Sequence, residues 1–378
     1  MSATQSVILA VNIGSSSIKF SAYPILEGAT RAIGPSVYSG TIQGLESGEQ
    51  SFEAALAHLK EEMSTALGDA QIKAVAHRVV HGGERYVHSV VVSPEILQDL
   101  HSLDRLAPLH QPHNLHGISA FSKAFPNLPQ IACFDTAFHA TLSQAEKAFP
   151  LTQALYAQGI HRYGFHGLSY HYVSKMLSAH TATARGKLLM AHLGNGSSLC
   201  ACMNGQSVAT TMGFSAVGGL MMGTRCGDLD PGVMLYLMQQ GMSAQALENL
   251  FYRQSGLKGM SGLSADMRTL RDSSEESARF AIEIYQRRVI REAGGLIATM
   301  KGVDVIAFAG GIGENDRVLR ADVCAGLGFL GLQLDQEKNL RAPNKQITAI
   351  HAPGSSVEVW IVPTDEGIVA AQEALALL

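Results

Sequence analysis

An apolar run that ends in a small, polar turn constrains this chain more than any other feature. Residues 7–11 are apolar, and the segment NIGSSSIK follows them directly. Glycine permits a tight turn, serines offer hydroxyl and backbone N–H donors, and Lys19 adds a positive charge suited to phosphoryl oxygens. The pattern predicts a buried strand and a phosphate-binding loop closed by the lysine, although a serine-rich turn alone is most often just a turn.

Two further strand-to-loop units occur later in the chain. Residues 188–193 run into GNGSS, where GSS matches the GSS that begins at Gly14, and residues 303–309 run into a GGIGEN loop. The match indicates internal duplication, and three such loops favour close approach of backbone to a ligand. Neither a GxxxxGK[ST] sequence nor a complete GxGxxG fingerprint occurs, which excludes a P-loop protein and argues against a Rossmann dehydrogenase.

Length and charge limit the class of protein. A chain of 378 residues, 46% hydrophobic and 16% charged, suits two globular domains. A net charge of -4 gives no electrostatic footprint for nucleic acid or an anionic membrane. No segment reaches the roughly 18 apolar residues of a membrane span, and the N-terminus lacks the basic start of a signal peptide. We therefore expect a cytoplasmic protein with no nucleic-acid or membrane partner.

The cysteine and histidine patterns argue against disulfides and against a catalytic metal site. The five cysteines are scattered, which predicts reduced thiols, and Cys200 and Cys202 share one face of a strand-like run, which predicts buried ones. The fifteen histidines include two clusters, His77/His81/His88 and His110/His113/His116. No HExxH motif or nearby carboxylate completes either set, so hydrogen-bonded histidines in a polar cleft are favoured over a metallohydrolase.

Periodicity predicts alternating helices and strands. Helical spacing is clearest at 51–67 and 275–300, strand-like runs precede the glycine loops, and a C-terminal helix follows a strand at 357–362. This alternation is typical of an α/β fold.

Two arginines lie in unusual settings. Arg78 stands in HRVVHGGE and Arg225 in MGTRCGDLDP, both among apolar residues and glycines. Phosphoryl transfer to an anionic acceptor needs such cations, although an arginine of this kind is about as often a salt-bridge partner. Asp135, His166 and Glu366 are further polar groups in apolar turns, where a lone group normally caps or pairs.

Taken in order, the motifs closely resemble those of the acetate kinase (acetate/propionate kinase, or acetokinase) family. The matching segments run from Asn12 to Glu366 and read VNIGSSSIKF, HRVVHGGE, APLH, FDTAFH, YGFHG, HLGNGSS, TMGF, MGTRCGDLDP, GGIGEN and PTxE. The resemblance implies the duplicated, ribonuclease H-like fold of acetate and sugar kinases, heat-shock ATPases and actin, with two α/β domains around a nucleotide cleft. It implies an N-terminal domain of residues 1–138 plus 367–378, closed by the C-terminal helix, and a C-terminal domain of residues 139–366 that carries the adenosine site.

The same resemblance implies an activity. This is reversible, Mg²⁺-dependent transfer of the ATP γ-phosphoryl group to acetate, giving acetyl phosphate and ADP, in a homodimer, with Mn²⁺ as an alternative metal. A carboxylate is already a nucleophile at pH 7, so alignment and charge neutralisation suffice. Three alternatives stay open: a kinase of propionate or another acceptor, a kinase that uses pyrophosphate, and a non-kinase module in which nucleotide gates binding.

Site residues carry over from the family's motifs. The implied catalytic residues are Arg78, Asp135, His166 and Arg225. Acyl-substrate contacts are implied for Arg78, Val80, Leu109, His110, Phe165 and Ala216. Nucleotide contacts are implied for Ser15, Ser17, Lys19, His192, Leu193, Gly194, Asn195, Gly196, Asp266, Met267, Arg268, Gly310, Gly311, Ile312, Gly313, Glu314 and Asn315. The metal is assigned to Asn12 and Glu366.

Two positions depart from the family's pattern. Ala216 stands where relatives commonly have a proline that resembles a wall of the acyl pocket, and the smaller side chain predicts a wider pocket that admits propionate. The other wall positions, Val80, Leu109 and Phe165, match the family, so acetate stays the favoured acceptor. Gly367 stands where many relatives have a second glutamate beside the one at Glu366, which bears on metal affinity.

Overall fold

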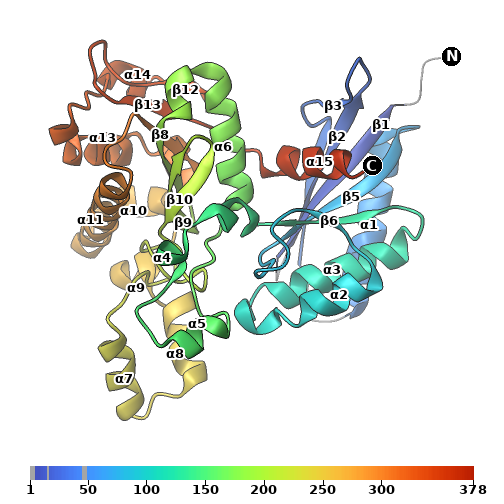
Figure 1. Ribbon diagram of the computed structural model, residues 1–378, viewed down its shortest axis with the longest axis horizontal. Helices are drawn as coiled ribbons and strands as arrows, with labels where there is room; N and C mark the ends of the chain where they lie inside the picture. The colour runs from blue at the N-terminus through green and yellow to red at the C-terminus, as the bar shows by residue number, and fades with distance from the viewer. Residues whose placement is uncertain (1–4, 15–16, 45–48) are drawn as a thin grey trace. The chain divides into compact units, whose positions relative to one another are not determined.

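The computed structural model describes residues 5–14, 17–44 and 49–378 (Figure 1). The chain divides into two compact units: unit 1 comprises Met1–Ala140 and Asp365–Leu378, and unit 2 comprises Thr141–Thr364. Among the described helices, none combines the length and apolar character needed to cross a bilayer.

Unit 1 is a mixed sheet with helices on both faces. Its strands are β1 (Ser6–Ile13), β2 (Ser17–Leu26), β3 (Ala32–Ile33), β4 (Tyr38–Gln43), β5 (Gln71–Val79), β6 (Val90–Val91) and β7 (Gln130–Phe134). Its α-helices are α1 (Glu49–Leu67), α2 (Pro94–His101), α3 (Gln111–Ala124) and α15 (Glu366–Ala376). The strand order is β3-β2-β1-β5-β7-β6, and β4 also pairs with β2. Strands β1, β5 and β7 are parallel to one another, whereas β2, β4 and β6 pair antiparallel.

Alternation along the strands assigns the two faces of this sheet. Leu9, Val11 and Ile13 share a core with apolar residues of α1 and with Phe121 of α3. Cys133 of β7 points to the opposite face, where its thiol donates to the carbonyl of Ala370 in α15 at 3.8 Å. Helices α1 and α3 therefore cover one face and α15 covers the other, and the central strands are buried on both sides.

Unit 2 is built around a second mixed sheet. Its strands are β8 (Lys187–Leu193), β9 (Ser197–Met203), β10 (Gln206–Thr210), β11 (Val305–Ala309), β12 (Thr348–Ala349) and β13 (Glu358–Ile361). Its longer helices are α6 (Gly167–His180), α7 (Pro231–Gln239), α8 (Ala244–Arg253), α11 (Glu276–Thr299) and α13 (Arg317–Gly326). Its shorter helices are α4 (Gln144–Lys147), α5 (Gln153–Ala157), α9 (Gly256–Ser261), α10 (Met267–Arg271), α12 (Gly310–Asn315) and α14 (Gln336–Leu340).

The two sheets have the same topology. The order β10-β9-β8-β11-β13-β12 in unit 2 matches β4-β2-β1-β5-β7-β6 in unit 1. The pairings match as well: each sheet has an antiparallel hairpin (β1/β2, β8/β9), two parallel pairs beside it and an antiparallel edge strand. This correspondence confirms the duplication that the repeated GSS turn predicts.

Several sequence predictions are confirmed. Strands β1, β8 and β11 occupy the three apolar runs, and helices α1 and α11 occupy the two helical patterns. Cys200 and Cys202 are fully buried on one face of β9, and burial raises the pKa of Cys202 to about 11. These thiols are therefore structural and inert at neutral pH.

Two predicted loops differ from the structure. The β1/β2 ladder continues to the pair Ile13 and Ile18, so Ser17 and Lys19 belong to β2 and the lysine does not close a loop. Gly14 donates its N–H to the carbonyl of Ser17 at 2.9 Å, one step beyond the last ladder pair. The GGIGEN segment is helix α12 rather than a loop.

Candidate active site

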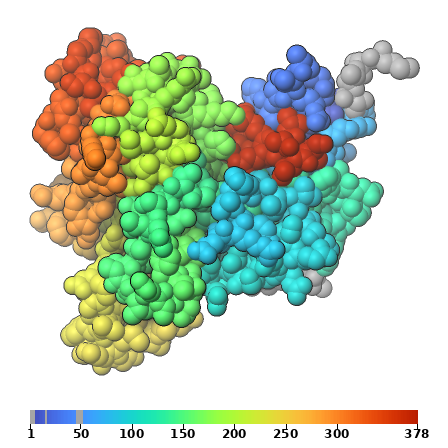
Figure 2. Space-filling model, viewed as in Figure 1, coloured from blue at the N-terminus to red at the C-terminus, as the bar shows by residue number. Residues whose placement is uncertain are grey.

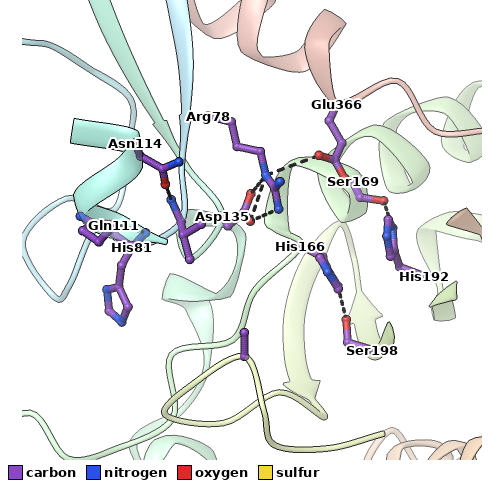
Figure 3. A network of polar contacts seen from close by, with 12 residues as sticks. Arg78, His81, Gln111, Asn114, Asp135, His166, Ser169, His192, Ser198 and Glu366 are labelled. Atoms are coloured by element: carbon purple, nitrogen blue, oxygen red, sulfur yellow. Dashed lines mark hydrogen bonds and ion pairs between the residues drawn. The ribbon is translucent and has the colours of Figure 1, made fainter. Parts of the chain in front are cut away.

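The first cluster of charged side chains lies in unit 1, where parallel strands β5 and β7 end. Arg78 of β5 donates Nε to both carboxylate oxygens of Asp135, at 3.0 and 3.1 Å, and Nη2 to Oδ2 at 2.6 Å (Figure 3). Glu366, the first residue of α15, places Oε2 3.5 Å from the same Nε. Ligands of open α/β sheets commonly bind beyond the carboxyl ends of parallel strands, and this cluster occupies that position.

The electrostatics of this cluster keep Arg78 charged. Burial lowers the pKa of Arg78, but the carboxylates of Asp135 and Glu366 and the Asp135 hydrogen bond outweigh burial, so the net shift is upward. The Asp135 side chain is 2% exposed and that of Arg78 is 23% exposed. Asp135 therefore holds the guanidinium in one orientation, and the Arg78 side chain stays partly exposed, so the charge could bind an anion.

Helix α3 holds the turn that follows Arg78. Asn114 accepts a hydrogen bond from the Val80 N–H at 3.0 Å and donates to the Ile13 carbonyl at 2.7 Å. Gln111 accepts from the His81 N–H at 3.1 Å and donates to the His81 carbonyl at 2.9 Å (Figure 3). All four hydrogen bonds are buried, so they fix the ends of β1 and β5 relative to each other.

The predicted metal residues offer the right donor chemistry. Asn12 is the penultimate residue of β1, and Glu366 begins α15, which packs on β1 and β5. Mg²⁺ binds oxygen atoms and usually keeps several waters beside one or two carboxylates and substrate phosphates. In the described part of the chain, no three His, Cys, Asp or Glu side chains are grouped to hold a metal ion. An amide oxygen and one carboxylate fit a metal that phosphates and water complete.

The predicted acyl-pocket residues are divided between the units. Val80 is buried, Leu109 is half-buried and His110 is the N-cap of α3, all in unit 1. Phe165 is buried and Ala216 is half-buried in unit 2. The structure brings Val80 and Arg78 together at the end of β5, and it places Ala216 against Arg225 as described below.

The second cluster lies in unit 2 around His166. This residue is the N-cap of α6 and has a left-handed backbone, with φ of 61° and ψ of 24°. A non-glycine residue seldom adopts this conformation, and strain of this kind concentrates at functional sites. The His166 ring stacks on that of His192, with centroids 4.3 Å apart, and its Nδ1 lies 2.8 Å from the Ser198 hydroxyl (Figure 3).

Arg225 and His166 converge on the predicted phosphate loop. A Cβ placed on Gly196 would lie 3.3 Å from Nε2 of His166 and 3.9 Å from Nη1 of Arg225. The same Nη1 donates to the carbonyl of Ala216 at 3.0 Å, which fixes the guanidinium. The fold of unit 2 therefore brings His166 and Arg225 to Gly196. Because glycine has no side chain, a ligand could approach the backbone between these two residues.

A cavity of about 840 Å³ opens beside this cluster in unit 2. Eight of its lining residues are predicted nucleotide contacts: Gly194, Asn195, Asp266, Met267, Arg268, Gly311, Ile312 and Asn315. Five lining residues were missed by the sequence analysis: Ala265, Arg271, Asp316, Arg317 and Val318. Three of these directly follow GGIGEN, so extending that motif by one turn would have found them. The volume suits a nucleotide-sized ligand.

The other predicted nucleotide residues lie outside that lining. Three of them are buried: Leu193, the last residue of β8, and Gly310 and Gly313, in helix α12 directly after β11. Glu314 accepts the Gly310 N–H at 3.0 Å and the Thr364 N–H at 3.1 Å, so its carboxylate braces the turn. His192 and Gly196 belong to the His166 cluster. Ser17 and Lys19 lie on β2 in unit 1, and Ser15 lies outside the described residues.

Comparison with known proteins decides the family. Residues 7–372 match the model of the acetokinase family. The chain belongs to this family. Acetate kinases of Rhodopseudomonas palustris (strain ATCC BAA-98 / CGA009) and Methylocella silvestris are 44% and 43% identical to this chain, and each alignment covers 98% of both sequences.

Solved structures confirm the fold. The crystal structure of Porphyromonas gingivalis acetate kinase matches with a TM-score of 0.88 at 33% identity, covering 98% of this chain and 99% of that one. A propionate kinase from Francisella tularensis matches with a TM-score of 0.86 at 33% identity, covering 97% and 98%. The acetokinase resemblance and the duplicated α/β fold predicted from the sequence are both confirmed.

Proposed function

We propose that this chain catalyses reversible transfer of the γ-phosphoryl group of ATP to acetate, giving acetyl phosphate and ADP. It is then a phosphotransferase whose acceptor is a carboxyl group. Membership of the acetokinase family and the names of the relatives support the reaction. The observation that carries the proposal is the convergence of His166 Nε2 and Arg225 Nη1 on Gly196, where a phosphoryl group could lie against backbone.

The chemistry asks for positioning rather than for a base. The acetate carboxylate attacks the γ-phosphorus directly, so no proton has to be removed, and the barrier falls when negative charge is neutralised along the in-line path. Arg225 and Arg78 would bind the acceptor carboxylate and the migrating phosphoryl group. His166 would donate from Nε2 to a phosphoryl oxygen, and Asp135 would orient Arg78 through the contacts described above.

The nucleotide would occupy the unit 2 cavity. Asp266, Met267 and Arg268 begin α10 on one wall, and Gly311 and Ile312 of α12 form another. These residues would surround adenosine, while Asn195 and Gly196 would lie along the phosphates. We further propose that the compact units correspond to the family's two domains, with the adenosine site in the C-terminal one.

Asn12 and Glu366 would hold Mg²⁺, or Mn²⁺ in its place. The ion supplies charge neutralisation of the phosphates. Glu366 also faces Arg78, so neutralising it as Gln should both weaken the metal site and loosen the arginine. Chelation of divalent ions should abolish turnover, and added Mg²⁺ should restore it.

Propionate is a second acceptor that one observation favours. The carbonyl of Ala216 accepts a hydrogen bond from Nη1 of Arg225, and the Ala216 side chain is only a methyl group. One methylene in an apolar pocket is worth about 1 to 3 kcal/mol, which cannot exclude propionate strictly. A larger side chain, as in Ala216→Val, should therefore lower kcat/KM for propionate more than for acetate.

We propose that the chain acts as a cytoplasmic homodimer. All five cysteines are free, which agrees with a reducing compartment. Helix α7 exposes apolar side chains, including Leu235 at 55% and Tyr236 at 59%, and residues 231–242 carry no charge (Figure 2, yellow). An uncharged apolar helix suits a second copy bringing the same surface. Leu235→Asp should convert a dimer to monomer in sedimentation, and a monomeric wild type would contradict this assignment.

The reverse reaction tests the proposed function. Purified protein supplied with acetyl phosphate, ADP and Mg²⁺ should release ATP, detected by luciferase. Arg225→Gln and His166→Gln should reduce the rate by a factor of about 10² or more, as expected for lost transition-state donors. Arg291→Gln, which removes an exposed arginine on α11, is the matched control and should leave the rate unchanged. Equal rates in all four proteins would contradict the assignment.

A further inference from the structure

The state of the His166 ring decides what it can do. Its Nδ1 lies 2.8 Å from the hydroxyl of Ser198, and its Nε2 faces Gly196. A neutral imidazole carries one ring proton, so the partner of Nδ1 determines whether Nε2 donates or accepts a hydrogen bond. Only a protonated Nε2 can donate to a phosphoryl oxygen.

Ser198 bridges His166 to Tyr170. The Ser198 hydroxyl is 2.5 Å from the Tyr170 hydroxyl, and both side chains are fully buried. Burial raises the pKa of Tyr170 well above its ordinary value, so the phenol keeps its proton. The Ser198 oxygen lies within hydrogen-bond distance of the phenol, so it can accept the proton that the phenol keeps.

The single hydroxyl proton of Ser198 links the directions of the two hydrogen bonds. When Tyr170 donates to Ser198, the single hydroxyl proton of Ser198 is free to go to the Nδ1 lone pair of His166. We propose that Tyr170 and Ser198 are positioning residues that hold His166 as the neutral tautomer protonated at Nε2. Nε2 is thereby a permanent donor, and no second positive charge is needed beside Arg225. The inference rests on the proposed function only in naming a phosphoryl oxygen as the acceptor.

A second contact fixes the plane of the ring. His192 stacks on His166 with an interplanar angle of 28°, and Ser169 holds Nδ1 of His192 at 2.8 Å (Figure 3). Ser169 and Tyr170 are neighbours in the first turn of α6, so a single turn of helix supports both imidazoles. The hydrogen-bond chain Tyr170–Ser198–His166, here called the relay, sets the tautomer of His166. The stacking on His192 sets the direction in which its Nε2 points.

Kinetics of two conservative variants test the relay. Tyr170→Phe removes only the phenol oxygen, and Ser198→Ala removes the bridging hydroxyl. We expect kcat to fall about 10- to 100-fold, the usual cost of losing a histidine's orienting partner, with KM for acetate and ATP within about twofold of wild type. Ser198→Thr keeps a hydroxyl and should recover most of kcat.

The chain offers a matched control one residue away. Ser197 faces the other side of β9, where its hydroxyl lies 2.8 Å from that of Tyr285, and this pair is also buried. Tyr285→Phe therefore removes an equivalent Tyr–Ser hydrogen bond that does not reach His166. The Ser197 hydroxyl also bonds Gly194 of the predicted phosphate loop, with 2.9 Å to its carbonyl, and keeps that contact in Tyr285→Phe. The variant should therefore leave kcat unchanged.

Nitrogen NMR measures the tautomer without any substrate. In protein labelled with ¹⁵N-histidine, the signals lost in His166→Gln identify this ring. We expect wild type and Tyr285→Phe to show a protonated Nε2 and an unprotonated Nδ1 at pH 7.5, and Ser198→Ala to show a mixture of the two tautomers.

Each outcome decides the proposal. A wild-type His166 protonated at Nδ1, or a kcat for Tyr170→Phe equal to that of Tyr285→Phe, overturns the relay. If Tyr170→Phe does not fold, the Ser198→Ala and Ser198→Thr pair carries the kinetic test. A protein inactive toward carboxylates that still shows the Nε2–H tautomer would contradict the proposed function and leave the relay intact.

Discussion

Arg271 and Asp316 form an ion pair that ties together two walls of the unit 2 cavity. Nε of Arg271, the last residue of α10, lies 3.1 Å from Oδ2 of Asp316. Asp316 is the N-cap of α13, and its other oxygen accepts the N–H groups of Val318 and Leu319. Nη2 of Arg271 is buried, and no hydrogen-bond partner for it occurs among the described residues. The contact with Asp316 thus anchors Arg271 and sets the spacing of the two walls.

Breaking this pair should weaken nucleotide binding selectively. Arg271→Met and Asp316→Asn should each raise KM for ATP several-fold, with KM for acetate unchanged. Asn caps a helix about as well as Asp, so Asp316→Asn removes the charge and keeps the cap of α13. The double variant should cost less than the sum of the two, because both changes break one interaction. Strict additivity, or an equal effect in the exposed-pair control Arg291→Met, would show that the pair does not set the cavity.

His77 should make the protein less stable in mild acid. Burial lowers the pKa of His77 to about 4, partly offset by the hydrogen bond between its Nε2 and Gln130 at 2.7 Å. The unfolded chain binds a proton near pH 6.5 while the folded chain does not until about pH 4. Stability is therefore full above pH 6.5 and is lost as the pH falls toward 4.

Urea unfolding at several pH values measures this loss. Between pH 7 and pH 5 the wild type should lose about 2 kcal/mol more of its unfolding free energy than His77→Gln does. His101→Gln, which replaces an exposed histidine of unit 1, should follow the wild type. Parallel pH curves for wild type and His77→Gln would contradict the assignment.

Gly367 is required by the packing of Tyr23. A Cβ at this position would meet the Tyr23 hydroxyl well inside van der Waals contact, and that hydroxyl donates to Asp365, the N-cap of α15. Gly367→Ala should therefore destabilise the protein by about 1 to 3 kcal/mol, the usual cost of overpacking. Gly295→Ala is the control, because it lies on α11 with open space around it. Thermal unfolding should show a gain of about 0.5 to 1 kcal/mol for the control, and a similar gain for Gly367→Ala would refute the packing argument.

Much of the fold could be predicted because local pattern and final structure agree. The apolar runs at β1, β8 and β11 are buried on both faces, so their composition alone marks them as central strands. The prediction that GGIGEN forms a loop was wrong for a physical reason. The glycines of this segment disfavour a helix, but Glu314 bonds Gly310 and Thr364, and Arg320 bonds the carbonyls of Gly313 and Glu314. The Thr364 contact is 50 residues away in sequence, and the Arg320 contacts come from the next helix, so the composition of GGIGEN alone does not report them.

The candidate site was predicted unevenly for a similar reason. Residues inside strong motifs, such as Arg225 and His166, could be named because the motifs carry them. Tyr170 and Arg271 could not, because their importance depends on one contact each, with Ser198 and with Asp316. One of the clustered histidines, His77, is buried and hydrogen-bonded to Gln130. This environment favours a structural histidine over a metal ligand.

The central claim is carboxylate phosphorylation, and trapping of the acyl phosphate with hydroxylamine tests it most directly. Purified protein, Mg²⁺ and ATP would be incubated with acetate, propionate, butyrate or no acid, with Arg225→Ala in parallel. We predict a hydroxamate from acetate, less from propionate, and almost none from butyrate, from the no-acid sample or from Arg225→Ala. ATP binding without hydroxamate from any acid would contradict the account.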